Sequence, residues 1–131
     1  ELSAICHIKI LHQYVFRNLN PAVFGIRIEG GRLKSNMKLM DERGEKVAKV
    51  KDIQNNKIKV QEATKGMEVA LSLPGINFER QLKDKTDLYS DITDTQFKEF
   101  KDNKDILTQE EIKILQKIAQ IKRKDKPTWG V

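Results

Sequence analysis

Gly25 and Gly30 are separated by four residues, a spacing that also opens phosphate-binding P-loops. Such a loop continues with a lysine, which holds the β- and γ-phosphates, and with a serine or threonine, which binds magnesium. Gly31 and Arg32 occupy these positions here, and no helical pattern begins at this point. We therefore expect turn or bulge glycines rather than a nucleotide site, and no cofactor is predicted.

The residue types and their spacing give as little support to a metal site or a catalytic site as to a nucleotide site. Cys6, His7 and His12 are the only soft ligands of the chain, and their spacing matches no zinc motif. The carboxylates at positions 41–42 and 84–87 fall in predicted loops, with no sign of the shared apolar pocket that shifts a catalytic pKa. We predict neither a metal site nor an enzyme.

The composition indicates a soluble globular protein with an anionic partner. Of 131 residues, 38% are hydrophobic and 34% are charged, and the net charge is +6. This excess of positive charge favours RNA, DNA, an acidic protein or anionic lipid, without choosing among them. No apolar run approaches the ~20 residues of a membrane span, and one cysteine excludes an internal disulfide. The chain starts without methionine, so we expect a cytoplasmic fragment of a longer protein.

Alternating apolar residues and turn residues dominate the chain up to about residue 92. We predict strands at residues 8–16, 23–28, 33–40, 46–53, 57–61, 68–73 and 88–92. Turn signals separate them, including Asn20-Pro21 and Gly30-Gly31, and a bulge is expected in the fourth strand. Many short strands joined by hairpin turns favour a mainly β fold, a closed antiparallel β-barrel over residues 1–92.

Helical signals begin at Thr93, where we predict a helical appendage over residues 93–131. Thr93 with Gln96, and Thr108 with Glu111, have the spacing of capping boxes. The first helix is interrupted at residues 102–105, and the second runs to about Lys124 before Pro127 stops it. The barrel is therefore followed by two C-terminal helices.

The last helix has two apolar stripes. One contains Ile112, Leu115 and Ala119, and the other contains Ile114, Ile118 and Ile121. Either the helix packs against both its partner helix and the barrel, or one stripe belongs to a groove that accepts an outside peptide. The basic tail, which starts with Lys122 and Arg123, would then favour an acidic partner, and Trp129 would anchor the tail.

Basic residues are interleaved through the predicted barrel, and Arg27, Lys34, Lys57 and Lys65 are among them. They are compatible with an evenly charged solvent face and with phosphate contacts along one rim. Aromatic residues such as Tyr14 and Phe16 either belong to the core or supply planes on which bases stack.

Four stretches of the sequence carry a resemblance to a known family: IKIL and YVFR at residues 8–17, NPAVFG with GRLK at residues 20–34, EATKGMEVA at residues 62–70, and IKRK with PTWG at residues 121–130. On these stretches the chain resembles the C-terminal domain (domain IV) of archaeal translation initiation factor 5B, in the family of bacterial initiation factor 2. The match covers nearly the whole chain.

The resemblance implies a non-catalytic piece of a translational GTPase that joins ribosomal subunits, with the GTP-binding domain absent from this chain. The barrel would resemble domain II of elongation factor Tu and bind the acceptor end of methionylated initiator tRNA. The two helices would dock the C-terminal tail of initiation factor 1A. The expected setting is the ribosome in the cytoplasm, with the chain as a monomer and without membrane contact.

The resemblance also implies two sets of site residues. The tRNA set comprises Ile26, Arg27, Lys34, Asn55, Asn56, Lys57, Lys65 and Glu68. The partner set comprises Ile112, Leu115, Ile118, Ile121, Lys122 and Arg123. Glu68 would lie near the free α-amino group of methionine, and the hairpin with Asn55 and Asn56 departs from the basic and aromatic hairpin of the bacterial factor. The alternative function is a docking module whose helices bind a partner peptide while the barrel contacts RNA non-specifically.

Overall fold

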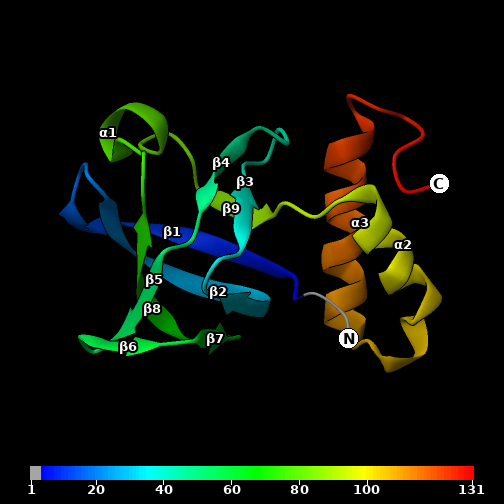
Figure 1. Cartoon of the computed structure of the whole chain (residues 1–131), viewed down its shortest axis with the longest axis horizontal. Coiled ribbons are helices and arrows are strands. Elements are labelled where there is room, and N and C mark those ends of the chain that lie inside the picture. Colours follow the sequence, from blue (N-terminus) through cyan, green and yellow to red (C-terminus); the bar gives the residue numbers. More distant parts are fainter. Residues whose placement is uncertain (1–3) are drawn as a thin grey trace.

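The computed structural model describes residues 4–131. The β part contains β1 (Cys6–Arg17), β2 (Ala22–Lys34), β3 (Lys38–Met40), β4 (Lys46–Lys49), β5 (Asp52–Asn55), β6 (Ile58–Val60), β7 (Glu62–Thr64), β8 (Glu68–Leu73), α1 (Phe78–Gln81) and β9 (Asp87–Ser90). The chain then forms α2 (Asp94–Asp102), the 3-10 helix η1 (Lys104–Ile106) and α3 (Gln109–Arg123). Figure 1 shows α2 and α3 side by side at one end of the sheet.

The strands form one curled antiparallel sheet, in the order β4-β3-β9-β1-β2-β8-β5-β6, with β7 paired to β2. Within residues 4–131 no ladder joins β4 to β6, so the sheet is an open half-barrel and the predicted closure is not confirmed. The fourth predicted strand divides into β4 and β5 at Val50 and Lys51, near the expected bulge. The short helix α1, which Asn77 caps, was not predicted.

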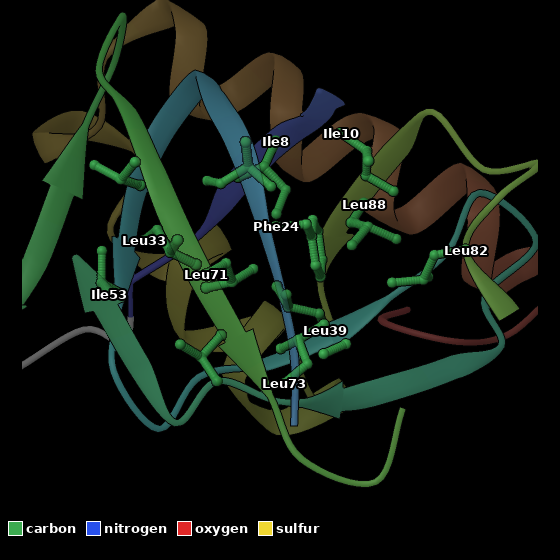
Figure 2. Packing of buried hydrophobic residues seen from close by; sticks show 14 of the residues in the cluster. Ile8, Ile10, Phe24, Leu33, Leu39, Ile53, Leu71, Leu73, Leu82 and Leu88 are labelled. Atoms are coloured by element: carbon green, nitrogen blue, oxygen red, sulfur yellow. The ribbon is translucent and has the colours of Figure 1, made fainter. Parts of the chain in front are cut away.

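Successive side chains of a strand point alternately into and away from the half-barrel, and this alternation explains which residues form its core. In β1, Cys6, Ile8 and Ile10 are buried, and Phe24 and Ile26 follow the same pattern in β2. Figure 2 shows residues of this core pointing from several strands into the space that the sheet encloses. The predicted turn at Gly30-Gly31 is wrong, since β2 continues to Lys34 with a register shift opposite His7 and Ile8.

A second apolar cluster joins the helices to the sheet. It contains Ile5, Met40, Tyr89, Ile92, Phe97, Phe100, Ile114, Leu115, Ile118, Ala119, Ile121 and Trp129. Five of the six stripe residues of α3 therefore pack within the chain, as the first of the two alternatives predicts, whereas Ile112 is half-buried and lies outside the cluster. Trp129 packs against Phe97 with ring centroids 4.9 Å apart, so the tail is anchored as predicted.

Candidate functional site

The outer face of three adjacent strands, β2, β8 and β5, is a shallow trough. Antiparallel register aligns their outward residues in rows across the strands, and these rows are Val23–Ser72–Asp52, Gly25–Ala70–Gln54 and Arg27–Glu68. The middle row has the smallest side chains on β2 and β8, so the sheet has a floor with little side-chain bulk there. The floor is therefore shaped by Gly25 and Ala70.

Two segments form the walls of this trough and enclose a hollow of about 540 Å³. On one side β1 leaves the core after Ile10, and Tyr14 and Phe16 lie over the trough. Tyr14 packs so closely on Gly25 that a Cβ at Gly25 would lie 2.9 Å from the Tyr14 Cβ. On the other side is the β5–β6 turn, where Asn56 and Lys57 have φ angles of 53° and 68°.

The hollow combines an apolar surface with single charges of both signs. Tyr14 and Phe16 are 48% and 66% exposed, although aromatic side chains usually bury much of their area. The side chains of Lys57 and Glu68 make no hydrogen bond or ion pair within residues 4–131, although Glu68 interacts electrostatically with Arg27 on the neighbouring strand. We call this site the aromatic hollow. It suits a ligand with an apolar part, a flat ring and both cationic and anionic groups.

Arg27, which lies opposite Glu68, forms its hydrogen bond with a different carboxylate, that of Glu29. Its Nε donates a hydrogen bond to Glu29 Oε2 at 2.7 Å. This hydrogen bond and the adjacent carboxylate raise the pKa of Arg27, and the same hydrogen bond lowers the pKa of Glu29. The pair partly cancels the positive charge beside the hollow, and Glu68 keeps only an electrostatic interaction with Arg27, without a hydrogen bond.

The structure brings together only part of the predicted tRNA set. Asn56, Lys57 and Glu68 line the aromatic hollow, and Asn55 lies beside them, paired with Ile58 across the hairpin. Arg27 is at the edge, in the row of Glu68. These five residues come from β2, β5, β8 and the β5–β6 turn, which the sheet brings together, and their role in binding a ligand stays a prediction.

Three predicted residues lie elsewhere. Ile26 is fully buried in the core, so its side chain cannot cover an aminoacyl group, and its assignment to the site is wrong. Lys34 lines a separate hollow of about 320 Å³ between the sheet and the start of α2. Lys65 forms an ion pair with Glu110 of α3. Its ammonium is therefore already partly neutralised.

Most of the apolar lining of the hollow was not assigned from the sequence: Leu11, Val23, Gly25, Val69 and Ala70. The sequence is compatible with either a core or a stacking role for Tyr14 and Phe16, and their exposure favours the stacking role. A sequence signal was present, because apolar residues alternate with polar ones up to Ile10 and then form the unbroken run Tyr14-Val15-Phe16. In the structure residues 12–17 are all exposed.

A second concave surface, which we call the helical groove, lies between α2, η1 and α3 and has a volume of about 220 Å³. Phe97, Ile112 and Leu115 provide apolar lining. Lys101, Lys104 and Arg123 provide three cations, and no carboxylate is among the described lining residues. The Arg123 Nε donates to the Trp129 carbonyl at 2.7 Å, which fixes the guanidinium at one end of the groove.

The predicted partner set divides between this groove and the interior. Ile112, Leu115 and Arg123 line the groove. Ile118 and Ile121 are only 0% and 2% exposed and belong to the chain's own packing, so they cannot contact a partner directly. Lys122 pairs with Asp91 and lies 6.0 Å from the Trp129 ring, so it also has an internal role.

Other chemistry finds little support among the described residues. No group of three or more metal-ligating side chains occurs within residues 4–131. The single cysteine, Cys6, is buried, and burial raises the pKa of its thiol to about 12. In the same part of the chain no helix has the length and hydropathy required to cross a membrane.

Comparison with known proteins identifies the fold family. Residues 5–89 match the family model described as elongation factor Tu domain 4. The chain belongs to this family. It is 38% identical over its full length to the probable translation initiation factor IF-2 of Methanopyrus kandleri, and 40% identical over 94% of its length to that of Methanoculleus marisnigri. The resemblance to the C-terminal domain of archaeal initiation factor 5B is thereby confirmed.

A solved structure agrees with these relatives. The crystal structure of GDP-bound aIF5B from Aeropyrum pernix superimposes with a TM-score of 0.90 and 27% identity over 98% of this chain. The chain spans about a fifth of the length of its relatives, 22% of the M. kandleri factor and 22% of the A. pernix chain. The match lies in domain 4 and not in a GTPase domain.

Proposed function

We propose that this domain binds the acceptor end of methionylated initiator tRNA in the aromatic hollow. The observation that carries the proposal is the convergence of Tyr14, Phe16, Lys57 and Glu68 on one hollow in a chain whose relatives are named translation initiation factors. A methionyl-adenosine end has the matching parts: an aromatic base, an apolar side chain, a cationic amine and a phosphate.

Each part of this ligand meets a suitable surface. The terminal base stacks on Tyr14 or Phe16, as bases do on exposed aromatic residues of RNA-binding proteins. The methionine side chain lies on the apolar floor, and the Glu68 carboxylate accepts a hydrogen bond from the free α-ammonium. Lys57 supplies a further cation that attracts the negatively charged RNA backbone. The domain itself is non-catalytic and acts on the ribosome in the cytoplasm, as a monomer within a longer factor.

The test is a titration of the chain with methionylated and deacylated initiator tRNA at two salt concentrations. We expect tighter binding of the methionylated form and weaker binding of both forms at higher salt, because phosphate contacts release counterions. Glu68→Gln should reduce the preference for the methionylated form by about fivefold, since it removes a charge-assisted hydrogen bond.

Glu99→Gln is the matched control, because Glu99 is an exposed carboxylate on α2 outside the hollow. It should leave the preference unchanged. Equal binding of the two tRNA forms by the unmodified chain would reject the acceptor-end function and favour the alternative, in which the sheet contacts RNA only through its charge.

A second proposed activity is docking of an acidic, apolar peptide, the C-terminal tail of initiation factor 1A, in the helical groove. The three cations and the apolar floor of the groove favour such a peptide. Lys104→Gln should weaken binding of the tail peptide, while Lys117→Gln on α3, outside the groove, should not. Equal effects of the two substitutions would indicate attraction by net charge alone.

A further inference from the structure

The trough continues beyond the aromatic hollow into a second hollow of about 260 Å³. Val23, Gln54 and Ala70 line both hollows, so the two are parts of one continuous surface. The second hollow lies over the row Val23–Ser72–Asp52, one row along the strands from Gly25 and Ala70. A ligand that fills the aromatic hollow can therefore extend into the second hollow without leaving the sheet.

The charges of the two hollows differ. The second hollow has Arg17 at the end of β1 and Lys51 between β4 and β5. Its one carboxylate, Asp52, is paired with Lys59 at 3.5 Å. The Arg17 Nε donates to the Leu19 carbonyl at 3.0 Å, which fixes the guanidinium while its terminal nitrogens remain free for a ligand.

A hydroxyl beside these cations can donate to an anionic ligand. Ser72 lies on the outward face of β8, lines the second hollow and is only 8% exposed. Its Oγ forms no hydrogen bond within residues 4–131, and it is accessible to solvent, because no buried side-chain N or O atom in these residues lacks a partner. A phosphate oxygen in the second hollow can accept a hydrogen bond from this accessible donor.

We propose that Arg17, Lys51 and Ser72 form a phosphate subsite that binds the phosphodiester on the 5′ side of the terminal nucleoside. The inference rests on the proposed function, because the nucleoside itself occupies the aromatic hollow. Glu68 and Ser72 are four residues apart on one strand, about 13 Å, so the α-ammonium and the phosphate bind at opposite ends of the trough. Lys51 is one of the interleaved basic residues of the sequence, but the four residues predicted to hold phosphates, Arg27, Lys34, Lys57 and Lys65, do not include Arg17, Lys51 or Ser72.

The experiment compares four ligands by NMR titration of the full chain: amide-linked methionyl-adenosine, the same compound with a 5′-phosphate, adenosine 5′-monophosphate and inorganic phosphate. In the unmodified chain the 5′-phosphate should increase the affinity of methionyl-adenosine. Arg17→Gln and Lys51→Gln should each reduce this gain by about two- to fivefold, the range for exposed charge pairs. Ser72→Ala should also reduce the gain, and it leaves the charge unchanged.

Lys49→Gln is the matched control, since Lys49 is an exposed lysine two residues from Lys51 and does not line the hollow. In this variant, the affinity gained when methionyl-adenosine carries the 5′-phosphate should equal the gain in the unmodified chain. If all variants show the same gain while methionyl-adenosine still binds, the phosphate subsite is wrong and the proposed function stands.

The other ligands separate the remaining outcomes. If adenosine 5′-monophosphate binds with dependence on Arg17 and Lys51 but methionyl-adenosine does not bind, the subsite stands and the methionine-binding function is wrong. Binding of inorganic phosphate as tight as that of the nucleotide would overturn the RNA assignment in favour of a free-anion site. Failure of all four ligands to bind would reject both proposals.

Discussion

Asp41 is a single buried carboxylate that holds a turn together. It is 3% exposed, and its Oδ1 accepts hydrogen bonds from the backbone N–H groups of Arg43 at 2.9 Å and Glu45 at 3.0 Å. Its Oδ2 lies 3.1 Å from the Lys85 ammonium. Burial alone would raise the pKa of Asp41, but these hydrogen bonds and the lysine together hold its pKa below the ordinary value of 3.8.

This shift predicts an acid-sensitive contribution to stability. Because the folded-state pKa lies below the unfolded value, the carboxylate stabilises the fold fully above about pH 4, and this contribution is lost as the pH falls through the folded-state pKa. Asp41→Asn should lower the free energy of unfolding at neutral pH by about 1.5–3 kcal/mol and flatten its acid dependence. Urea unfolding between pH 2 and 7 measures both, with the exposed Asp125→Asn as control.

Gly31 is required by its surroundings, not only by its backbone angle. Its φ is +75°, and a Cβ there would lie 2.1 Å from the Ile5 carbonyl oxygen. Gly66 has a φ of +88° with nothing within 4 Å of such a Cβ. Gly66→Ala should therefore lower the free energy of unfolding by about 1–2 kcal/mol, because alanine is disfavoured in the left-handed region. Gly31→Ala should lower it by more than about 3 kcal/mol, because the added Cβ also clashes with the Ile5 carbonyl. Equal losses in urea unfolding would show that β1 moves away without cost.

The capping boxes are the clearest success of local sequence reading at the level of elements. The Thr108 hydroxyl accepts a hydrogen bond from the Glu111 N–H, and the Glu111 carboxylate accepts one from the Thr108 N–H. Thr93 and Gln96 form the same pair at the start of α2. These signals depend only on residues three positions apart, which explains why the sequence located both helix starts correctly.

Thr108→Ala should destabilise the chain by about 1 kcal/mol, because it leaves one N–H at the start of α3 without a partner. Thr108→Ser retains the accepting oxygen and should restore most of the lost stability. Thermal unfolding followed by circular dichroism measures the three proteins. A loss as large in the serine variant as in the alanine variant would assign the effect to the methyl group instead.

Elements that depend on distant partners were harder to predict. Gly30-Gly31 has the composition of a turn, but β2 continues through it because β1 and β7 supply partners on either side of the register shift. The strand β7 and the four-residue helix α1 are too short for a periodic signal. The exclusion of Ile26 from the site, in contrast, follows from the alternation with Phe24 and Ile28 and was available from the sequence.

The aromatic hollow is built from segments that lie far apart in the sequence. Its floor comes from β2 and β8, its walls come from β1 and the β5–β6 turn, and the two hollows join through Val23, Gln54 and Ala70. Sequence reading identified Asn56, Lys57 and Glu68 through a resemblance, but the small residues that make the floor have no chemical signal of their own. Only the register of three strands places Gly25 opposite Ala70 and Ala70 opposite Gln54.

The second apolar cluster bears on whether the β part (residues 1–92) and the helical part (residues 93–131) unfold separately. Ile118 is fully buried in this cluster together with Ile5, Met40 and Tyr89, which belong to the β part of the chain. Ile118→Ala should therefore lower the free energy of unfolding by about 2–5 kcal/mol. Because the cluster spans both parts, we expect the helices and the sheet to lose this stability together.

Two probes decide between one cooperative unit and two domains. Trp129 fluorescence reports on the helices, and the NMR signal of the Ile26 amide reports on the sheet. In one unit, Ile118→Ala shifts both urea midpoints equally, while Lys117→Ala at the neighbouring exposed position shifts neither by more than about 0.5 kcal/mol. If only the Trp129 midpoint moves, residues 93–131 form a separate domain, and the helical groove can respond to its partner without changing the aromatic hollow.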